Sequence, residues 1–279
     1  MKPKMKKHAS AAMLVVFLIS TALLIRNVFS YGSGDDTYSD AAELARSAAA
    51  AEPTETEPPT TEPPVEETVE PVLAWVPAPL AEEDPIMEKL KETDLDALRQ
   101  VNEDVLGWIQ IPGSRIDYPI LQGEDNEYYL KRTWKGYRNP VGSIFLETLN
   151  SNDFTDWNTI IYGHNMSDGS MFGGLQRYKR QNYWEEHPYI YIVTDLGVLR
   201  YEVFSTYVAE VDSKTYGLSF QQNRTREEFL AMALEQSQID TGIVPEITDQ
   251  IITLSTCSGG EATRRVVHAR MPMIQVTIE

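Results

Sequence analysis

The sequence predicts a mostly β domain, a barrel or a sandwich, that follows an apolar N-terminal segment and a polar stretch. Three observations lead to this fold class. The second half of the chain consists largely of short runs of β-branched and aromatic residues, which are typical of strands. Few helical patterns interrupt these runs, and there is no internal repeat. The part from Pro85 onwards is long enough to bury a core of its own.

The N-terminal residues have the pattern of a membrane anchor. Four lysines precede an apolar run over 9–25, and Arg26 closes it. This run is at the short end for a spanning helix, and the basic flank before it predicts a cytoplasmic N-terminus. A cleaved signal peptide is the alternative, but no A-x-A-like cleavage site follows directly. We therefore expect a cytoplasmic segment at 1–8, an uncleaved anchor at 9–29, and the remainder outside the cell.

A disordered spacer is predicted over residues 30–84. Pro, Thr and Glu make up nearly all of 52–71, and such a stretch buries too little apolar surface to offset its ordering entropy. Fourteen acids and one base, Arg46, lie between Asp35 and Asp84, so this stretch carries most of the net charge of −18. The charge therefore describes the spacer, and no nucleic-acid partner is expected.

The folded domain is expected to span 85–279 and to begin with a helix. Asp84 has the N-cap position and Pro85 the first turn, and apolar residues at helical spacing continue to Val101. Strands predominate after that, with a hairpin turn at Pro-Gly-Ser. In chain order, the later elements are strands at 106–111, 116–121, 142–146 and 159–162, a helix at about 170–178, strands at 189–193 and 198–208, a helix opened by a capping box at Thr225 and running to about 238, and strands at 250–255, 265–271 and 274–278.

Cys257 is the only cysteine in the chain. It follows an apolar strand that ends in small polar residues, and two glycines, Gly259 and Gly260, come soon after it. A thiol at a strand end beside a flexible loop can meet a substrate, whereas a thiol inside an apolar strand is inert. A buried structural cysteine is the alternative, but this placement favours a nucleophile.

A nucleophilic cysteine needs a partner that supports its thiolate. The chain has four histidines. His8 lies on the cytoplasmic side of the predicted anchor, and His187 precedes a proline in a loop, where a solvated surface histidine is expected. His164 follows a strand and Gly163, so it too lies at a strand end and is favoured. His268, inside a strand, remains the alternative.

Acyl transfer also needs positive charge or hydrogen-bond donors where the oxyanion forms. Arg264 and Arg265 open the strand after Cys257, so their side chains point to opposite faces. Periodicity does not choose between them, because an apolar residue follows on each face. Neither a zinc-binding H-E-x-x-H motif nor a cysteine pair occurs, so no metal is expected.

These residues resemble a known family, the sortases. The block TLSTC is followed by an arginine eight positions after the cysteine, and Tyr-Gly-His-Asn-Met surrounds the histidine. Three longer stretches are similar to class B sortases in particular: YGHNMSDGSMFGGLQRY, GWIQIPGSRIDYPILQGEDNEYYL and GSIFLE. A helix between the strand near 201–208 and the cysteine strand also fits class B. The resemblance covers about 86–279.

The resemblance implies a closed β-barrel of about eight strands with an N-terminal helical extension and a helix in the loop before the cysteine strand. It also implies a membrane-anchored cysteine transpeptidase with Cys257 as nucleophile and His164 as acid/base. The family spacing selects Arg265 as the oxyanion stabiliser. Such enzymes cleave a C-terminal sorting signal of surface proteins after Thr, and transfer the acyl group to an amine of a peptidoglycan precursor or cross-bridge.

Motif position further implies that Asn126, Leu130 and Ser255 line the groove for the sorting signal. Where some class B members carry an acid after the cysteine, this chain has Ser258, so an NPxTx-like or SPxTx-like signal is expected without a choice between them. No cofactor is expected. Two alternatives remain open: a cysteine endopeptidase that uses water as acceptor, and a non-catalytic protein associated with the cell wall.

Overall fold

The computed structural model describes residues 34, 36–47, 72–257 and 262–278, together with Thr21. Apart from Thr21, the predicted basic segment and anchor lie outside this part of the chain, as does the stretch rich in Pro, Thr and Glu. No helix in the described part combines the length and the apolar character needed to cross a bilayer.

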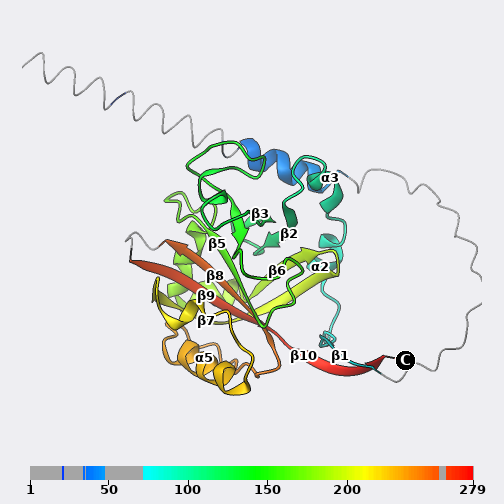
Figure 1. The fold of residues 1–279 in the computed structure, drawn as a ribbon, viewed down its shortest axis with the longest axis vertical. Helices are drawn as coiled ribbons and strands as arrows, with labels where there is room; N and C mark the ends of the chain where they lie inside the picture. The colour runs from blue at the N-terminus through cyan, green and yellow to red at the C-terminus, as the bar shows by residue number, and fades with distance from the viewer. Residues whose placement is uncertain (1–20, 22–33, 35, 48–71, 258–261, 279) are drawn as a thin grey trace, which may run out of the picture.

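Eight strands close into a barrel in the order β2-β3-β4-β5-β8-β9-β7-β6 (Figure 1). Neighbouring strands are antiparallel except for β3 with β4 and β5 with β8, which are parallel. Closure pairs both edges of the sheet, which removes exposed strand edges. The predicted mostly β fold and its closed eight-stranded barrel are confirmed. The strands are β2 (Val105–Gln110), β3 (Asp117–Leu121), β4 (Ile144–Leu146), β5 (Asn158–Gly163), β6 (Tyr189–Thr194), β7 (Gly197–Glu210), β8 (Gln250–Cys257) and β9 (Thr263–Met271).

Both faces of β8 are buried, because the barrel core covers one and a helix covers the other. Ile252 and Leu254 belong to the barrel core, whereas Ile251 belongs to a second cluster outside the barrel. This alternation follows from the period of two in a strand. The result is a rigid strand whose last residue is Cys257.

Helix α5 (Asn223–Glu235) forms that outer cluster and is the helix expected before the cysteine strand. Its buried residues Phe229 and Leu230 pack on the outer face of the barrel. The predicted capping box is wrong: the N-cap residue is Gln222, and the hydroxyl of Thr225 donates to the Gln222 carbonyl from inside the first turn. Its hydroxyl therefore bonds within the turn instead of capping the helix.

Two short helices replace the single one expected after Pro85. In α2 (Pro85–Leu90) the carboxylate of Asp84 accepts hydrogen bonds from two backbone amides of the first turn, which confirms the predicted cap. A second cap at Asp94 then begins α3 (Leu95–Arg99). The later non-strand elements are the 3-10 helices η2 (Tyr129–Lys131), η3 (Gly173–Lys179) and η4 (Lys214–Tyr216), and the helix α4 (Gln181–Glu186).

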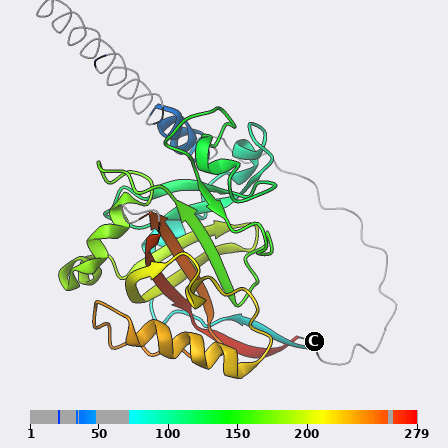
Figure 2. The same cartoon turned by 60° about the vertical axis from the view of Figure 1, so that its left-hand side comes forward.

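Two ordered elements lie inside the range predicted as a spacer. Residues 36–45 form a helix, here called the N-terminal helix, and β1 (Val72–Pro77) pairs with β10 (Met273–Ile278) in a separate two-stranded ribbon. The N-terminal helix and α5 lie at opposite ends of the barrel (Figure 2). The prediction of disorder rested on the composition of 30–84 as a whole. The acidic Pro-rich part dominates that composition, so the short apolar patterns on either side of it were not recognised.

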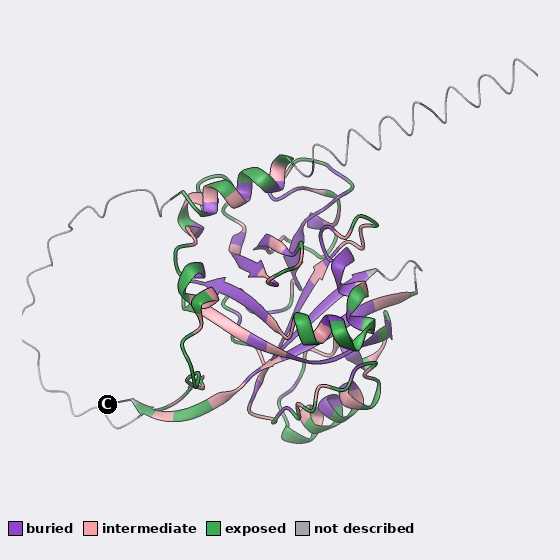
Figure 3. Ribbon diagram, turned by 180° about the vertical axis from the view of Figure 1, so that it is seen from behind, coloured by how far each residue is buried: buried purple, intermediate pink, exposed green. Residues whose placement is uncertain are grey.

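The N-terminal helix and the ribbon of β1 and β10 differ in how far their side chains are buried. The barrel strands are buried along much of their length, whereas the ribbon of β1 and β10 is largely exposed (Figure 3). Leu73 and Trp75 of β1 have exposed side chains. The N-terminal helix has a buried face, because Tyr38, Ala41 and Ala45 contribute to the barrel core cluster.

Replacing Phe229 should destabilise the fold. The ring is buried and packs edge-on against Phe220 and Trp157, with centroids 5.2 and 5.6 Å away. Phe229→Ala should lower the free energy of unfolding by about 3–5 kcal/mol, because it leaves a cavity between α5 and the barrel. Chemical denaturation measures this change. The neighbouring exposed Glu227→Ala is the matched control and should stay within about 0.5 kcal/mol; equal losses would contradict the assigned packing.

Candidate active site

Cys257 and His164 lie at the same end of two neighbouring strands. β5 and β8 run parallel, with Gly163 in register with Thr256. His164 is the residue after β5, and Cys257 is the last residue of β8. Because paired strands lie about 4.8 Å apart, the register brings the two backbone positions next to each other. For Cys257 the structure describes the backbone and not the side chain.

The imidazole of His164 is held between two backbone segments. Its Nε2 lies 2.6 Å from the carbonyl oxygen of Leu130. A carbonyl only accepts hydrogen bonds, so Nε2 carries the proton and Nδ1 of the neutral ring is the basic nitrogen. The other contact is Gly142, at φ +63°, where a Cβ atom would lie 2.7 Å from His164 Cδ2. A glycine is thus required there by both backbone conformation and space.

Arg264 and Arg265 occupy opposite faces of β9. Cys257 is paired with Arg264, and Thr256 with Arg265. Directly opposed residues share one face of a sheet, so the register puts Arg264 at the position facing Cys257, whereas the sequence prediction chose Arg265. The guanidinium of Arg265 is buried and donates to Gln238 Oε1 at 2.7 Å, and burial lowers its pKa.

The face of the sheet that continues from Cys257 carries a polar network. Ser255, two residues earlier, is buried, and its hydroxyl lies 2.9 Å from the Tyr216 hydroxyl. Tyr162 of β5 stacks on Tyr216 and donates to a carboxylate oxygen of Glu147 at 2.9 Å. Burial and the charge of Glu147 raise the pKa of Tyr162, so its phenol stays neutral. The network fixes this surface beside the end of β8.

The known proteins to which this chain is similar are sortases. The model of the Sortase domain matches residues 109–272. Sortase B of Listeria monocytogenes is 39% identical over 164 residues, which cover 59% of this chain and 67% of the relative. The chain belongs to the sortase family, class B. A solved Staphylococcus aureus sortase B–substrate complex matches with a TM-score of 0.61 at 32% identity, covering 65% of this chain and 85% of that one. Sortase B from Bacillus anthracis in complex with AAEK1 gives a TM-score of 0.66 at 28% identity, over 88% and 98%.

This sortase is therefore a cysteine transpeptidase of the sortase B type, an enzyme class that acts in cell-wall anchoring. The site described above lies at the end of the barrel where β5 and β8 terminate. That position follows from the pairing of β5 with β8, because two neighbouring strands that run parallel end side by side.

The three residues predicted to line the groove have defined contacts in this sortase. The Nδ2 of Asn126 donates to both carboxylate oxygens of Glu147 at 2.8 Å, and its Oδ1 accepts from the amide and hydroxyl of Thr148. Both ends of the amide therefore contact residues that follow β4, so Asn126 ties its loop to the end of β4. Leu130 offers its carbonyl to the candidate histidine, and Ser255 is paired with a tyrosine.

His268 is a core residue of this sortase. Thr253 gives its hydroxyl proton to Asn158, so its oxygen accepts from Nδ1 of His268 at 2.9 Å. The other ring nitrogen, Nε2, then accepts from the Tyr207 hydroxyl at 3.1 Å. Both nitrogens of a neutral imidazole are thus satisfied, and burial lowers the pKa of His268 to about 3. His187, expected to be solvated, is partly buried and contacts the Pro112 carbonyl through Nδ1 at 2.8 Å.

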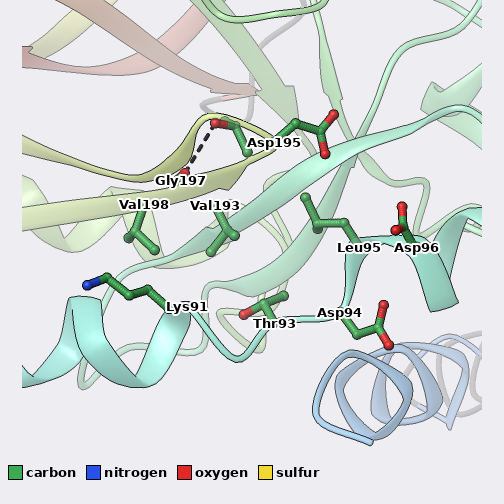
Figure 4. Close-up of a pocket in the computed structure, with 10 residues that line it drawn as sticks. Lys91, Thr93, Asp94, Leu95, Asp96, Val193, Asp195, Gly197 and Val198 are labelled. Atoms are coloured by element: carbon green, nitrogen blue, oxygen red, sulfur yellow. Dashed lines mark hydrogen bonds between the residues drawn. The ribbon is translucent and has the colours of Figure 1, made fainter. Parts of the chain in front are cut away.

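One pocket on the described surface lies away from these residues. The pocket in Figure 4 lies between the turn from α2 to α3 and the turn from β6 to β7, and none of its lining residues belongs to the site. Within the part of the chain that the structure describes, no three His, Cys, Asp or Glu side chains gather in a metal-binding cluster.

Sequence reasoning missed two residues around the histidine and its strand. Gly142 was taken as the first residue of a strand, although its place two residues after Pro140 is a turn signal that predicts a special backbone conformation. Glu147 was part of a family motif, but no sequence pattern indicated that its carboxylate would join Tyr162 and Asn126. Both contacts depend on segments distant in sequence.

Lowering the pH should destabilise the folded protein because of His268. The unfolded histidine binds a proton near pH 6.5 and the folded one only near pH 3, so between these values the unfolded chain holds the additional proton. The free energy of unfolding therefore decreases as the pH falls through this window, by up to about 1.4 kcal/mol per unit from this group.

Denaturant unfolding between pH 4.5 and 7.5 measures that slope. His268→Gln should flatten it, whereas His187→Gln should leave it as in the wild type. Identical slopes in all three proteins would show that His268 is not buried in its neutral form.

Proposed function

We propose that Cys257, His164 and Arg264 carry out the acyl transfer of this sortase on a C-terminal sorting signal of the NPxTx or SPxTx type. The observation that carries this proposal is the parallel register of β5 and β8, which sets the positions of the histidine and the cysteine side by side. The Cys257 thiol would supply the nucleophile, and Nδ1 of His164, the ring nitrogen that does not contact the Leu130 carbonyl, would supply the base.

In the first half-reaction the thiolate of Cys257 attacks the carbonyl carbon of the signal's Thr. The carbon–nitrogen bond breaks, the imidazolium of His164 gives its Nδ1 proton to the leaving amine, and a thioester remains. In the second half-reaction an acceptor amine attacks the thioester. The neutral imidazole takes the amine's proton, the new amide forms, and the thiolate leaves.

Arg264 is proposed to stabilise the oxyanion of both steps. Its support is the β8–β9 register, which opposes it to Cys257. The positive charge of Arg264 also acts on Tyr162 and lowers the pKa of that phenol against the larger effect of burial. Arg265, the choice made from family spacing, lies on the opposite face with Gln238 and is proposed to have a structural role.

The proposed partners are surface proteins that carry the sorting signal, and an amine of a peptidoglycan precursor or cross-bridge as acceptor. A relative from Staphylococcus aureus has been solved as a substrate complex, which supports a peptide groove in this class. Asn126, Leu130 and Ser255 remain proposed contributors to that groove, Leu130 through its side chain and Asn126 through its loop.

We infer that residues 9–29 anchor this sortase in the cell membrane, with 1–8 in the cytoplasm and the catalytic domain outside. The apolar run and its lysine flank support this topology. The N-terminal helix packs on the barrel, so only residues 30–35 separate it from the anchor. That length spans at most about 20 Å. The domain is therefore held near the membrane, and 48–71 connects two parts of one domain.

The two arginines give a direct test. Arg264→Ala should lower kcat/KM by about 10²–10³-fold, the usual effect of removing an oxyanion donor. Arg265→Ala should reduce the melting temperature and leave kcat/KM within a few-fold, because its contacts are internal. Steady-state kinetics and thermal unfolding of both variants measure this. A larger loss of kcat/KM in Arg265→Ala than in Arg264→Ala would show that Arg265 is the oxyanion stabiliser, as the family spacing implies.

Mass spectrometry of reactions with a panel of sorting-signal peptides tests the function itself. The peptides are incubated with the enzyme, with and without triglycine or diaminopimelate. We expect cleavage after Thr and a ligated product only when amine is present, and no product with Cys257→Ala. Cleavage that no amine affects would identify an endopeptidase, and full activity of Cys257→Ala would refute the proposed nucleophile.

A further inference from the structure

The N-terminal helix packs on the barrel through one narrow face. Tyr38, Ala41 and Ala45 are 7%, 0% and 2% exposed, and their spacing of three and four residues places them on the same side of a helix. Two of the three are alanines, so the helix backbone lies close to the domain. The ring of Tyr38 packs edge-on against Tyr118 of β3, with centroids 5.3 Å apart.

The first half of this helix contacts the loop between η2 and β4. The indole Nε1 of Trp134 donates to the Thr37 carbonyl at 2.8 Å, and Lys135 pairs with Asp40 at 3.0 Å. The hydroxyl of Tyr38 reaches furthest into the loop and donates to the carbonyl of Gly142 at 2.6 Å. The helix is therefore bonded to this loop at three successive points.

The second half of the helix is fixed to other parts of the domain. The amide of Asp94 donates to the carbonyl of Ala45 at 2.8 Å, and Arg46 pairs with Asp117 of β3 at 2.5 Å. Figure 4 shows Asp94 at the start of α3 beside the blue N-terminal helix. Because both halves are attached, the helix cannot move without breaking contacts to several elements.

The loop that receives Tyr38 is the one that holds His164. The Leu130 carbonyl, in η2 just before this loop, accepts from His164 Nε2, and Gly142 near the end of the loop lies against the ring. The two ends are joined, since the amide of Ser143 donates to the carbonyl of Tyr129 at 3.0 Å. A displacement of Gly142 would therefore change both surfaces that orient the imidazole.

We propose that the N-terminal helix is a positioning element of the transpeptidase site, and that the Tyr38 hydroxyl, by fixing the Gly142 carbonyl, sets the orientation of the His164 ring. The inference rests on the proposed role of His164 as acid/base. Tyr38 does not touch the reacting atoms. Its contribution is geometric, and a sub-ångström shift of an acid/base group is enough to lower a rate.

Burial makes the Tyr38 hydroxyl a specific fixing point. Its oxygen also lies 3.0 Å from Ser143 Oγ, and the Ser143 hydroxyl donates to the Arg132 carbonyl at 2.7 Å. Since the serine proton is used in that bond, the single proton of Tyr38 goes to Gly142. Burial raises the pKa of Tyr38, so the phenol remains a donor. Removing the hydroxyl leaves a buried carbonyl without this donor.

Tyr38→Phe tests the proposal, because it keeps the ring and removes only the hydroxyl. In the full chain in detergent micelles, we expect kcat for transpeptidation to fall by about three- to tenfold with KM within twofold, as a shifted acid/base group predicts. Tyr137→Phe is the matched control. Tyr137 lies in the same loop with its side chain exposed, and its variant should behave as the wild type.

A second measurement separates positioning from stability. Nitrogen-15 NMR of the histidine rings reports which nitrogen carries the proton, and comparison with His164→Gln assigns the signal. The wild type should show the Nε2-protonated ring, and Tyr38→Phe should increase the Nδ1-protonated fraction. A lowered melting temperature with unchanged kcat and unchanged ring signal would reduce Tyr38 to a structural residue and overturn the proposal.

The same experiments distinguish failure of this inference from failure of the proposed function. If His164→Gln keeps full activity, the acid/base assignment is wrong, and the ring signal in Tyr38→Phe alone decides whether Tyr38 orients the histidine. If His164→Gln is inactive and Tyr38→Phe equals Tyr137→Phe in kcat and ring signal, the proposed function stands and the positioning role is refuted.

Discussion

The parallel pairing of β5 with β8 is the constraint on which the site depends. Most neighbours in the barrel are antiparallel, and an antiparallel pair would have put His164 and Cys257 at opposite ends of the barrel. The closed barrel fixes this register, because every strand is hydrogen-bonded on both sides and a slip of one residue would turn core side chains outward. Two residues remote in sequence thereby become neighbours without a loop having to fold back between them.

The alternation of side chains along β9 places Arg264 and Arg265 on opposite faces of the sheet. One face of these strands continues the barrel core, and Arg265 lies buried on that face and donates to the exposed Gln238. The other face carries Ser255 and the tyrosines beside the end of β8. A guanidinium can act on a developing oxyanion only from the nucleophile's side. The proposal of Arg264 therefore rests on the register of a single strand pair.

The contacts that hold His164 extend well beyond β5 and β8. Its ring is oriented by a carbonyl and a glycine at the two ends of one loop, and this loop is bonded to the N-terminal helix. Side chains that set geometry need partners whose own positions are fixed. In this sortase those partners are largely backbone groups, which hold their positions more tightly than flexible side chains do.

The sequence by itself determined the fold class, most strands, and Cys257 and His164 as candidates, because period-two patterns, turn residues and a lone thiol at a strand end are local signals. The family motifs added the class. The faces on which Arg264 and Arg265 lie, the neutral core role of His268, the contacts of Asn126 and the docking of the N-terminal helix were decided only by the tertiary structure. Each depends on strand register or on contacts between segments far apart in the chain, and the local pattern of residues carries no information about such pairings.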